Sequence, residues 1–122
     1  MLENFREFEA GPDPFGDIWK VRFGWLQTAI AIRGSDSVDV KFFLTNGREQ
    51  LERIVAILHP DLLALSRESN HPLTDAWVMK LAALHLKHMV ETGEDFEKTL
   101  VTVTLDQLRR YGRMLEAAGA RR

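Results

Sequence analysis

The stretch from Thr74 to Thr92 is apolar around almost its whole circumference when it is drawn as an α-helix. At 3.6 residues per turn, one face carries Trp77, Leu81, Leu84 and His88, and the apolar surface continues on both sides. The polar sector is narrow and consists of Lys80, Lys87 and Glu91. A helix at an ordinary surface has a broad polar face, so we expect this one to be covered on most sides as the central helix of the domain.

Upstream of this helix, apolar and polar side chains alternate in three runs, which is typical of half-buried β-strands. The runs cover residues 19–23, 26–32 and 38–44. Gly24 lies between the first two runs and has two interpretations. It marks either a tight turn or a bulge in one long strand from about residue 17 to residue 33.

The turn at residues 34–37 limits how the second and third runs can pair. Residues opposite each other must share a face of the sheet, so Ile32 is expected opposite Val38 or Val40. The pairing with Val40 also sets Arg33 opposite Asp39, which is a favourable cross-strand pair. We therefore favour it slightly.

Residues 45–58 fit two different elements. Asn46-Gly47 is a strong signal for a type I′ hairpin and predicts a fourth strand from about residue 49 to residue 57. The same segment also matches the helical spacing i, i+3, i+4, i+7 through Leu51, Ile54, Val55 and Leu58. We favour the strand, because Asn-Gly lies at the right place for a hairpin turn and β-branched residues cluster in the segment.

The helix ends are marked more clearly. Pro60 suits the first position of a helix that runs to about residue 69. Thr74 suits the N-cap of the central helix, and Gly93 suits its C-terminal end. Thr104 and Gln107 form a capping box for a last helix, and the segment before it, within residues 99–103, reads as a short strand.

These elements predict an α+β fold in a single domain that covers residues 1–122, with residues 1–16 as a lead-in segment. An antiparallel β-meander of three or four strands spans about residues 17–57. Strands grouped before helices point to segregated layers and not to βαβ units. The expected helices cover residues 60–69, 74–92 and 105–118. The short late strand at 99–103 is expected to join the sheet edge or to pair with another subunit.

Composition sets the broad class of the protein. The chain has 122 residues, of which 45% are hydrophobic and 28% charged, which is ordinary for a soluble domain. It has no cysteine, so disulfides, thiolate metal sites and cysteine nucleophiles are excluded. There is no signal peptide and no apolar run that approaches ~20 residues, so we expect a cytoplasmic protein with no membrane partner. It is similar in kind to small bacterial proteins, and no motif identifies a family.

His85 and His88 are the candidate metal ligands, because two imidazoles three residues apart lie close together on a helix. A divalent metal such as zinc would need at least one further ligand. With such a ligand, the alternative function is a metal-binding protein or a metal-dependent hydrolase that uses His85 and His88. Such a ligand could come from Glu91, Glu94, Asp95, His59 or His71. No recognised metal signature is complete, so we favour the alternative that both histidines pack as hydrogen-bonded, half-apolar residues.

A surplus of aromatic residues predicts an interface. Five are hard to bury together with the central helix in so short a chain, and large uncovered apolar patches usually mark binding surfaces. They are Phe5, Phe8, Phe15, Trp25 and Phe43. Because of this surplus, we expect a non-enzymatic protein-interaction or regulatory module that forms a homodimer. No strained serine elbow, phosphate-binding loop or dinucleotide fingerprint is present.

A second surface hypothesis concerns nucleic acid. One face of the expected sheet carries four basic residues and an aromatic side chain that could stack on a base. These residues are Lys20, Arg22, Arg33, Lys41 and Phe43. However, Asp39 lies among them and the net charge of the chain is −2, so we do not expect a nucleic-acid partner.

Overall fold

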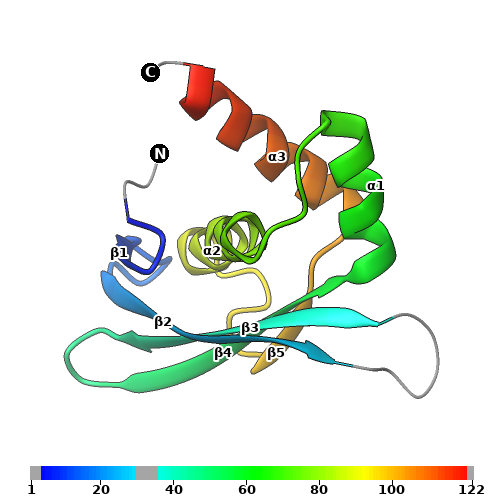
Figure 1. Cartoon of the computed structure of the whole chain (residues 1–122). Helices are drawn as coiled ribbons and strands as arrows, with labels where there is room; N and C mark the ends of the chain where they lie inside the picture. The colour runs from blue at the N-terminus through cyan, green and yellow to red at the C-terminus, as the bar shows by residue number, and fades with distance from the viewer. Residues whose placement is uncertain (1–3, 30–35, 121–122) are drawn as a thin grey trace.

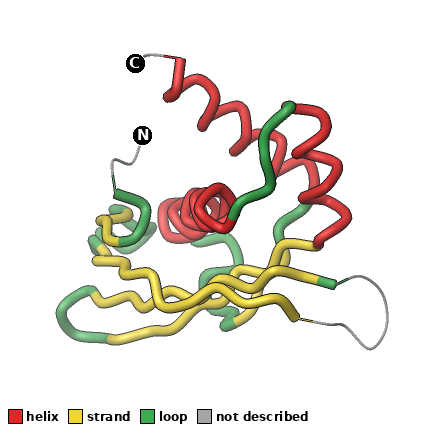
Figure 2. Tube along the Cα trace, in the orientation of Figure 1, coloured by secondary structure: helices red, strands yellow, loops and turns green. Residues whose placement is uncertain are grey.

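A computed structural model describes residues 4–29 and 36–120 of the chain. One sheet in the order β1-β2-β3-β4-β5 forms the first layer, and three helices on one of its faces form the second (Figures 1 and 2). The elements are β1 (Glu7–Ala10), β2 (Trp19–Ala29), β3 (Ser37–Thr45), β4 (Gln50–Leu58), α1 (His59–Ser69), α2 (Asp75–Thr92), β5 (Leu100–Thr102) and α3 (Leu105–Ala120). The predicted α+β fold, with an antiparallel meander before the helices, is confirmed.

The lead-in segment contains a strand that the sequence analysis did not predict. β1 pairs antiparallel with β2 and places Phe8 opposite Val21, on the face that the helices cover. A strand of four residues is too short for alternation to reveal. The following loop is held by Asp13, whose carboxylate accepts hydrogen bonds from the indole N–H of Trp19 and from two backbone N–H groups.

β2 is one long strand, and its pairing with β3 shifts between Phe23 and Trp25. Gly24 therefore marks a bulge, which was one of its two interpretations. The predicted register was wrong, because Val38 pairs with Thr28 and Val40 pairs with Leu26. Ile32 itself lies outside the described residues. Alternation fixes only which residues share a face, and a shift by an even number of residues leaves that face unchanged.

β4 settles the choice at residues 45–58 in favour of the strand, which pairs antiparallel with β3 from end to end. The connecting turn is longer than the Asn-Gly signal predicts, since Thr45 pairs with Gln50. Gly47 has a positive φ of 91°, whereas Asn46 does not, so the turn is not type I′. Instead, the Asn46 side chain accepts hydrogen bonds from the N–H groups of Arg48 and Glu49.

The predicted helix signals are confirmed. Thr74 Oγ1 caps α2 by accepting a hydrogen bond of 3.2 Å from the Trp77 N–H, and Gly93 ends the helix in a left-handed conformation. The Thr104 and Gln107 side chains cap each other's backbone N–H at 3.2 and 3.0 Å. The late strand β5 joins the sheet edge beside β4, in parallel orientation.

α2 is the central helix, as expected. It lies between the sheet and α3, with α1 to one side (Figure 1), and most of its residues are buried, including Trp77, Leu81 and Leu84. Below it, Phe42 of β3 is fully buried and packs edge-on against Phe8 and Phe23. No helix among the described residues combines the length and hydrophobicity needed to cross a bilayer.

The bulge at Gly24 depends on the absence of a side chain. A Cβ atom there would lie 2.7 Å from Phe43 Cε2 and 3.0 Å from the Lys41 carbonyl oxygen. We expect Gly24→Ala to lower the free energy of unfolding by about 1–3 kcal/mol, since the ring and the strand must shift apart. Urea denaturation measures the loss.

Gly119→Ala is the control for this substitution. It lies in α3 with nothing within 4 Å of the added methyl group, so it should leave the free energy of unfolding unchanged or raise it slightly. Equal stabilities for Gly24→Ala and the wild type would contradict the close contact at the bulge.

Candidate functional site

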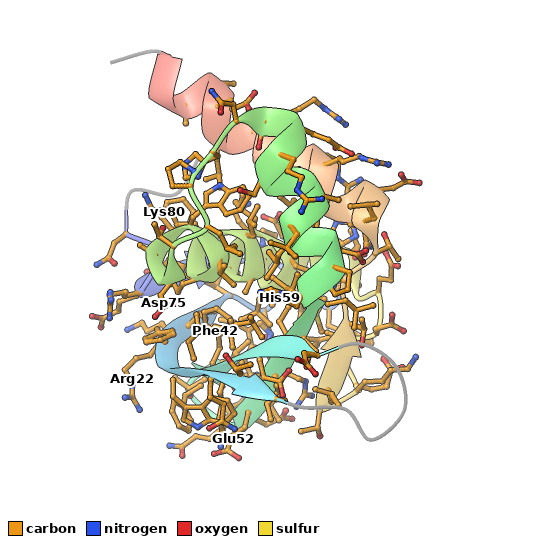
Figure 3. The ribbon with its side chains drawn as sticks, turned by 45° about the vertical axis from the view of Figure 1, so that its right-hand side comes forward. Arg22, Phe42, Glu52, His59, Asp75 and Lys80 are labelled. Carbon is orange, nitrogen blue, oxygen red and sulfur yellow. The ribbon has the colours of Figure 1, made fainter. Side chains whose placement is uncertain are left out.

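The sheet surface that points away from the helices is named the outer face. The strand register aligns its side chains in rows across the sheet. One row contains Glu7, Arg22, Phe43 and Glu52, and the next contains Trp25, Lys41, Ile54 and Leu100. Figure 3 shows Arg22 and Glu52 pointing away from the helices, whereas Phe42 lies between the sheet and α2. No helix in the described part of the chain covers this face (Figure 1).

Two aromatic rings and two cations lie near each other on the outer face. The Phe43 ring lies over Gly24, where the bulge leaves room for it. The Arg22 guanidinium carbon is 4.8 Å from the centre of this ring, and Lys41 Nζ is 5.3 Å from it. Lys41 Nζ also lies 5.8 Å from the centre of the Trp25 ring. Each such contact contributes about 0.5–1 kcal/mol at an exposed site, so the contacts favour this arrangement of the two rings.

A shallow concavity of about 780 Å³ opens beside the Phe43 ring. Its lining comes from β1 to β4 and from Thr99, and it includes Lys20, Arg22, Phe43 and Glu52. Among the described residues, no histidine, serine or cysteine lines it. Its mixture of one aromatic ring and both signs of charge suits protein contact.

Charges on the outer face are balanced between neighbouring strands. Arg22 pairs with Glu7 in the register, Lys20 pairs with Glu9, and Lys41 Nζ lies 3.1 Å from Glu52 Oε1. Asp39 adds a further acid opposite Gln27. Arg33, which belonged to the predicted basic face, lies outside the described residues. A surface of mixed sign does not concentrate the positive potential that binding to phosphates needs, so this geometry does not favour nucleic acid.

Of the five aromatic residues predicted for an interface, the structure brings together Trp25 and Phe43. Phe8 is buried in the core of the single chain, so it is not available to a partner. Phe5 packs at the margin of the core with Lys80 Nζ 5.6 Å from its ring, and Phe15 is 92% exposed on a separate loop.

Sequence reasoning missed two apolar members of the outer face, Ile54 and Leu100. Both belong to the row that contains Trp25 and Lys41, and Leu100 is 56% exposed. Alternation along β4 could have found Ile54 if the segment had been read firmly as a strand. Leu100 could be placed only after the pairing of β5 was known.

His85 is buried between α2 and α3, and its ring is engaged. Its Nδ1 lies 2.8 Å from the Tyr111 hydroxyl oxygen, and the side chain is 5% exposed. Burial, reinforced by the neighbouring His88, lowers the pKa of His85 to about 4. His88 stacks beside it at a centroid distance of 6.0 Å, and its Nε2 lies 3.0 Å from Glu94 Oε2.

The described residues contain no cluster of three or more histidine or acidic side chains that could hold a metal ion. His71, one candidate ligand, stacks on Trp77 at a centroid distance of 4.6 Å. The arrangement favours the alternative interpretation of His85 and His88 as hydrogen-bonded packing residues. A divalent metal at this pair stays a prediction, which elemental analysis of the purified protein would test.

Comparison of the chain with family models, curated proteins and solved structures finds no match. The function must therefore be inferred from the chain's own surfaces. The most developed of these is the outer face, where an aromatic pair, aliphatic neighbours and balanced charges occur together.

Proposed function

We propose that this chain is a non-enzymatic protein-interaction module that binds a second copy of itself through the outer face. The observation that carries the proposal is that two half-buried aromatic rings, Trp25 and Phe43, lie on a sheet face that no described helix covers, with Lys41 Nζ 5.8 and 5.3 Å from their centres. Sheets usually cover their apolar side chains with a second layer, and here the helices cover only one face. Stacking a second sheet on the outer face would remove these rings from water.

The charges support a second copy as the partner. The outer face carries three cations on β2 and β3, Lys20, Arg22 and Lys41, and four acids, Glu7, Glu9, Asp39 and Glu52. Two identical faces related by a two-fold axis can set the cations near β2 against acids of the other copy. Such an isologous contact needs a patch that complements itself, and a patch with both signs meets that requirement.

The distribution of polarity also resembles that of a stable interface. Phe43 and Ile54 lie on the inner strands β3 and β4, whereas Glu7 and Glu9 lie on β1 at one margin of the face. Interfaces commonly have an apolar centre that is enriched in aromatic residues and a polar rim that stays in contact with water. Aromatic side chains at the centre usually contribute most of the binding energy.

Substitution of Phe43 tests the proposal. We expect the wild type to form a dimer whose population rises with concentration, and Phe43→Ala to weaken this association by at least ~10-fold. Phe15→Ala is the matched control, because Phe15 is 92% exposed and lies in the loop between β1 and β2, outside the paired rows of the outer face. Sedimentation equilibrium over a wide concentration range measures the dissociation constant of the wild type and of each variant. Circular dichroism verifies that the variants are folded.

Two results would count against the outer face as the binding surface. One is a wild type that stays monomeric at every concentration. The other is an equal effect of Phe43→Ala and Phe15→Ala on the dissociation constant, which would show that the loss does not depend on this face.

A further inference from the structure

The edge of the sheet at β2 is only partly covered. β1 pairs with Trp19 to Arg22, and the Phe23 N–H then donates a hydrogen bond of 2.7 Å to the Arg6 carbonyl oxygen. From Gly24 to Ala29, β2 pairs with β3 on one side, and none of residues 4–29 or 36–120 pairs with it on the other. The second half of β2 is therefore an open strand edge, which we name the β2 edge.

Strand geometry indicates which backbone groups face this opening. In an antiparallel ladder, successive residues direct their N–H and C=O groups to alternate sides. The Phe23 N–H points toward β1, and the bulge brings Trp25 opposite Lys41. Alternation then directs the backbone groups of Leu26 and Thr28 away from β3 and toward the open side.

The β2 edge lacks the usual protection of an exposed strand. Natural proteins keep edge strands short, or place charges or proline on them, because unpaired backbone groups attract another strand. β1 and β5 follow this pattern, with four and three residues, and β1 also carries Glu7 and Glu9. In contrast, the segment from Trp25 to Ala29 has no charge and no proline.

We propose that the β2 edge pairs antiparallel with the β2 edge of a second copy. The inference rests on the proposed self-association and adds a contact that is separate from the outer face. A two-fold axis at Gln27 sets this residue opposite itself and pairs Leu26 with Thr28 of the other copy. Because the paired residues share a face, the helices of both copies lie on the same side and the two outer faces form one continuous surface.

A hollow next to the edge leaves space for the second strand. About 290 Å³ lies open between β2 and the beginning of α2, lined by Arg6, Phe23, Trp25, Leu26, Asp75 and Met79. Asp75 begins α2 above β2 (Figure 3). In the proposed register, Thr28 of the second copy lies beside Leu26 and extends toward this hollow, so α2 does not block the approach.

The uncharged edge favours an identical strand over a charged peptide. Two copies meet without like charges opposite each other, and each open N–H and C=O group of Leu26 and Thr28 finds a partner in the same arrangement. An extended peptide of another protein would use the same backbone groups, and it is an alternative outcome of the experiments below.

Proline at position 28 tests the backbone contact. All variants carry Phe43→Ala, which weakens the outer-face dimer and isolates association through the edge. We expect Thr28→Pro to abolish the remaining self-association in sedimentation equilibrium, because the open-side N–H is lost while pairing with β3 is kept. Thr28→Val retains the N–H and should associate like the parent. Equal association of both variants would overturn the proposal.

Disulfide trapping provides a second test that does not depend on proline being tolerated. The chain has no cysteine, so single cysteines report on one position each. At Gln27 on the two-fold axis, the Cα atoms of a non-hydrogen-bonded pair would be about 4.5 Å apart, within the range that a disulfide spans. Asp39, the β3 neighbour of Gln27, would lie roughly 14 Å from its copy, three strand spacings away.

We expect Gln27→Cys to give several-fold more cross-linked dimer than Asp39→Cys under mild oxidation. If Gln27→Cys gives no cross-linked dimer, or if both positions give equal yields, two copies do not pair through the β2 edge. The same results are expected if a peptide of another protein occupies this edge, and they would overturn the proposal in that case too. The outer-face proposal is judged separately, by the effect of Phe43→Ala on the wild-type dimer.

Discussion

Phe42→Ala is expected to lower the free energy of unfolding by about 3–5 kcal/mol, because it leaves a cavity in a core that can relax only partly. Phe42 is fully buried on the helix side of β3 and packs edge-on against Phe8 and Phe23. Small domains are stable by only about 5–15 kcal/mol, so the variant would lose a large fraction of its stability. Urea denaturation, followed by circular dichroism, measures the change.

The adjacent Phe43 is the matched control for this prediction. It has the same side chain one position along the strand but points to the outer face and is only half-buried. We expect Phe43→Ala to cost about 1–2 kcal/mol, mainly through lost apolar contact and the contacts with Arg22 and Lys41. If the two substitutions destabilise the protein equally, the assignment of Phe42 and Phe43 to opposite faces is wrong.

Acidification is expected to lower the free energy of unfolding through His85. The buried ring has a pKa of about 4 in the folded protein and about 6.5 when unfolded, so the unfolded chain binds more protons between these values. The neutral His85 ring therefore makes its full contribution to the free energy of unfolding above about pH 6.5, and this contribution decreases as the pH falls toward 4. From His85 alone, the free energy of unfolding should fall by about 2 kcal/mol between pH 7.5 and pH 5.

Urea denaturation at the two pH values measures this loss, and His85→Gln removes the titrating ring. The glutamine side chain can still form a hydrogen bond with the Tyr111 hydroxyl group, so the folded state keeps a partner for it. We expect the pH dependence to be about 2 kcal/mol smaller in this variant than in the wild type. His59→Gln, at the partly exposed start of α1, should retain the full loss. Identical pH dependence in the wild type and His85→Gln would contradict the role of His85.

The sequence by itself determined the identity and limits of most elements, because the relevant signals are local. Thr74 and Gly93 mark the ends of α2, and Thr104 with Gln107 marks the start of α3, through contacts within a few residues. The almost continuous apolar surface of α2 was sufficient to predict its central position, since such a helix needs cover on most sides. Alternation along β3 likewise assigned Phe42 and Phe43 to opposite faces.

Only the tertiary structure decided which strands meet and at which residues. Pairing Val40 with Leu26, adding β1 to the sheet and placing β5 beside β4 all join segments whose sequences fit several registers equally well. These pairings bring Leu100 beside Ile54 on the outer face. They also leave the β2 edge open beyond the end of β1. The sequence specified the side chains of the candidate surfaces, but long-range pairing of the strands decided which of them share a surface.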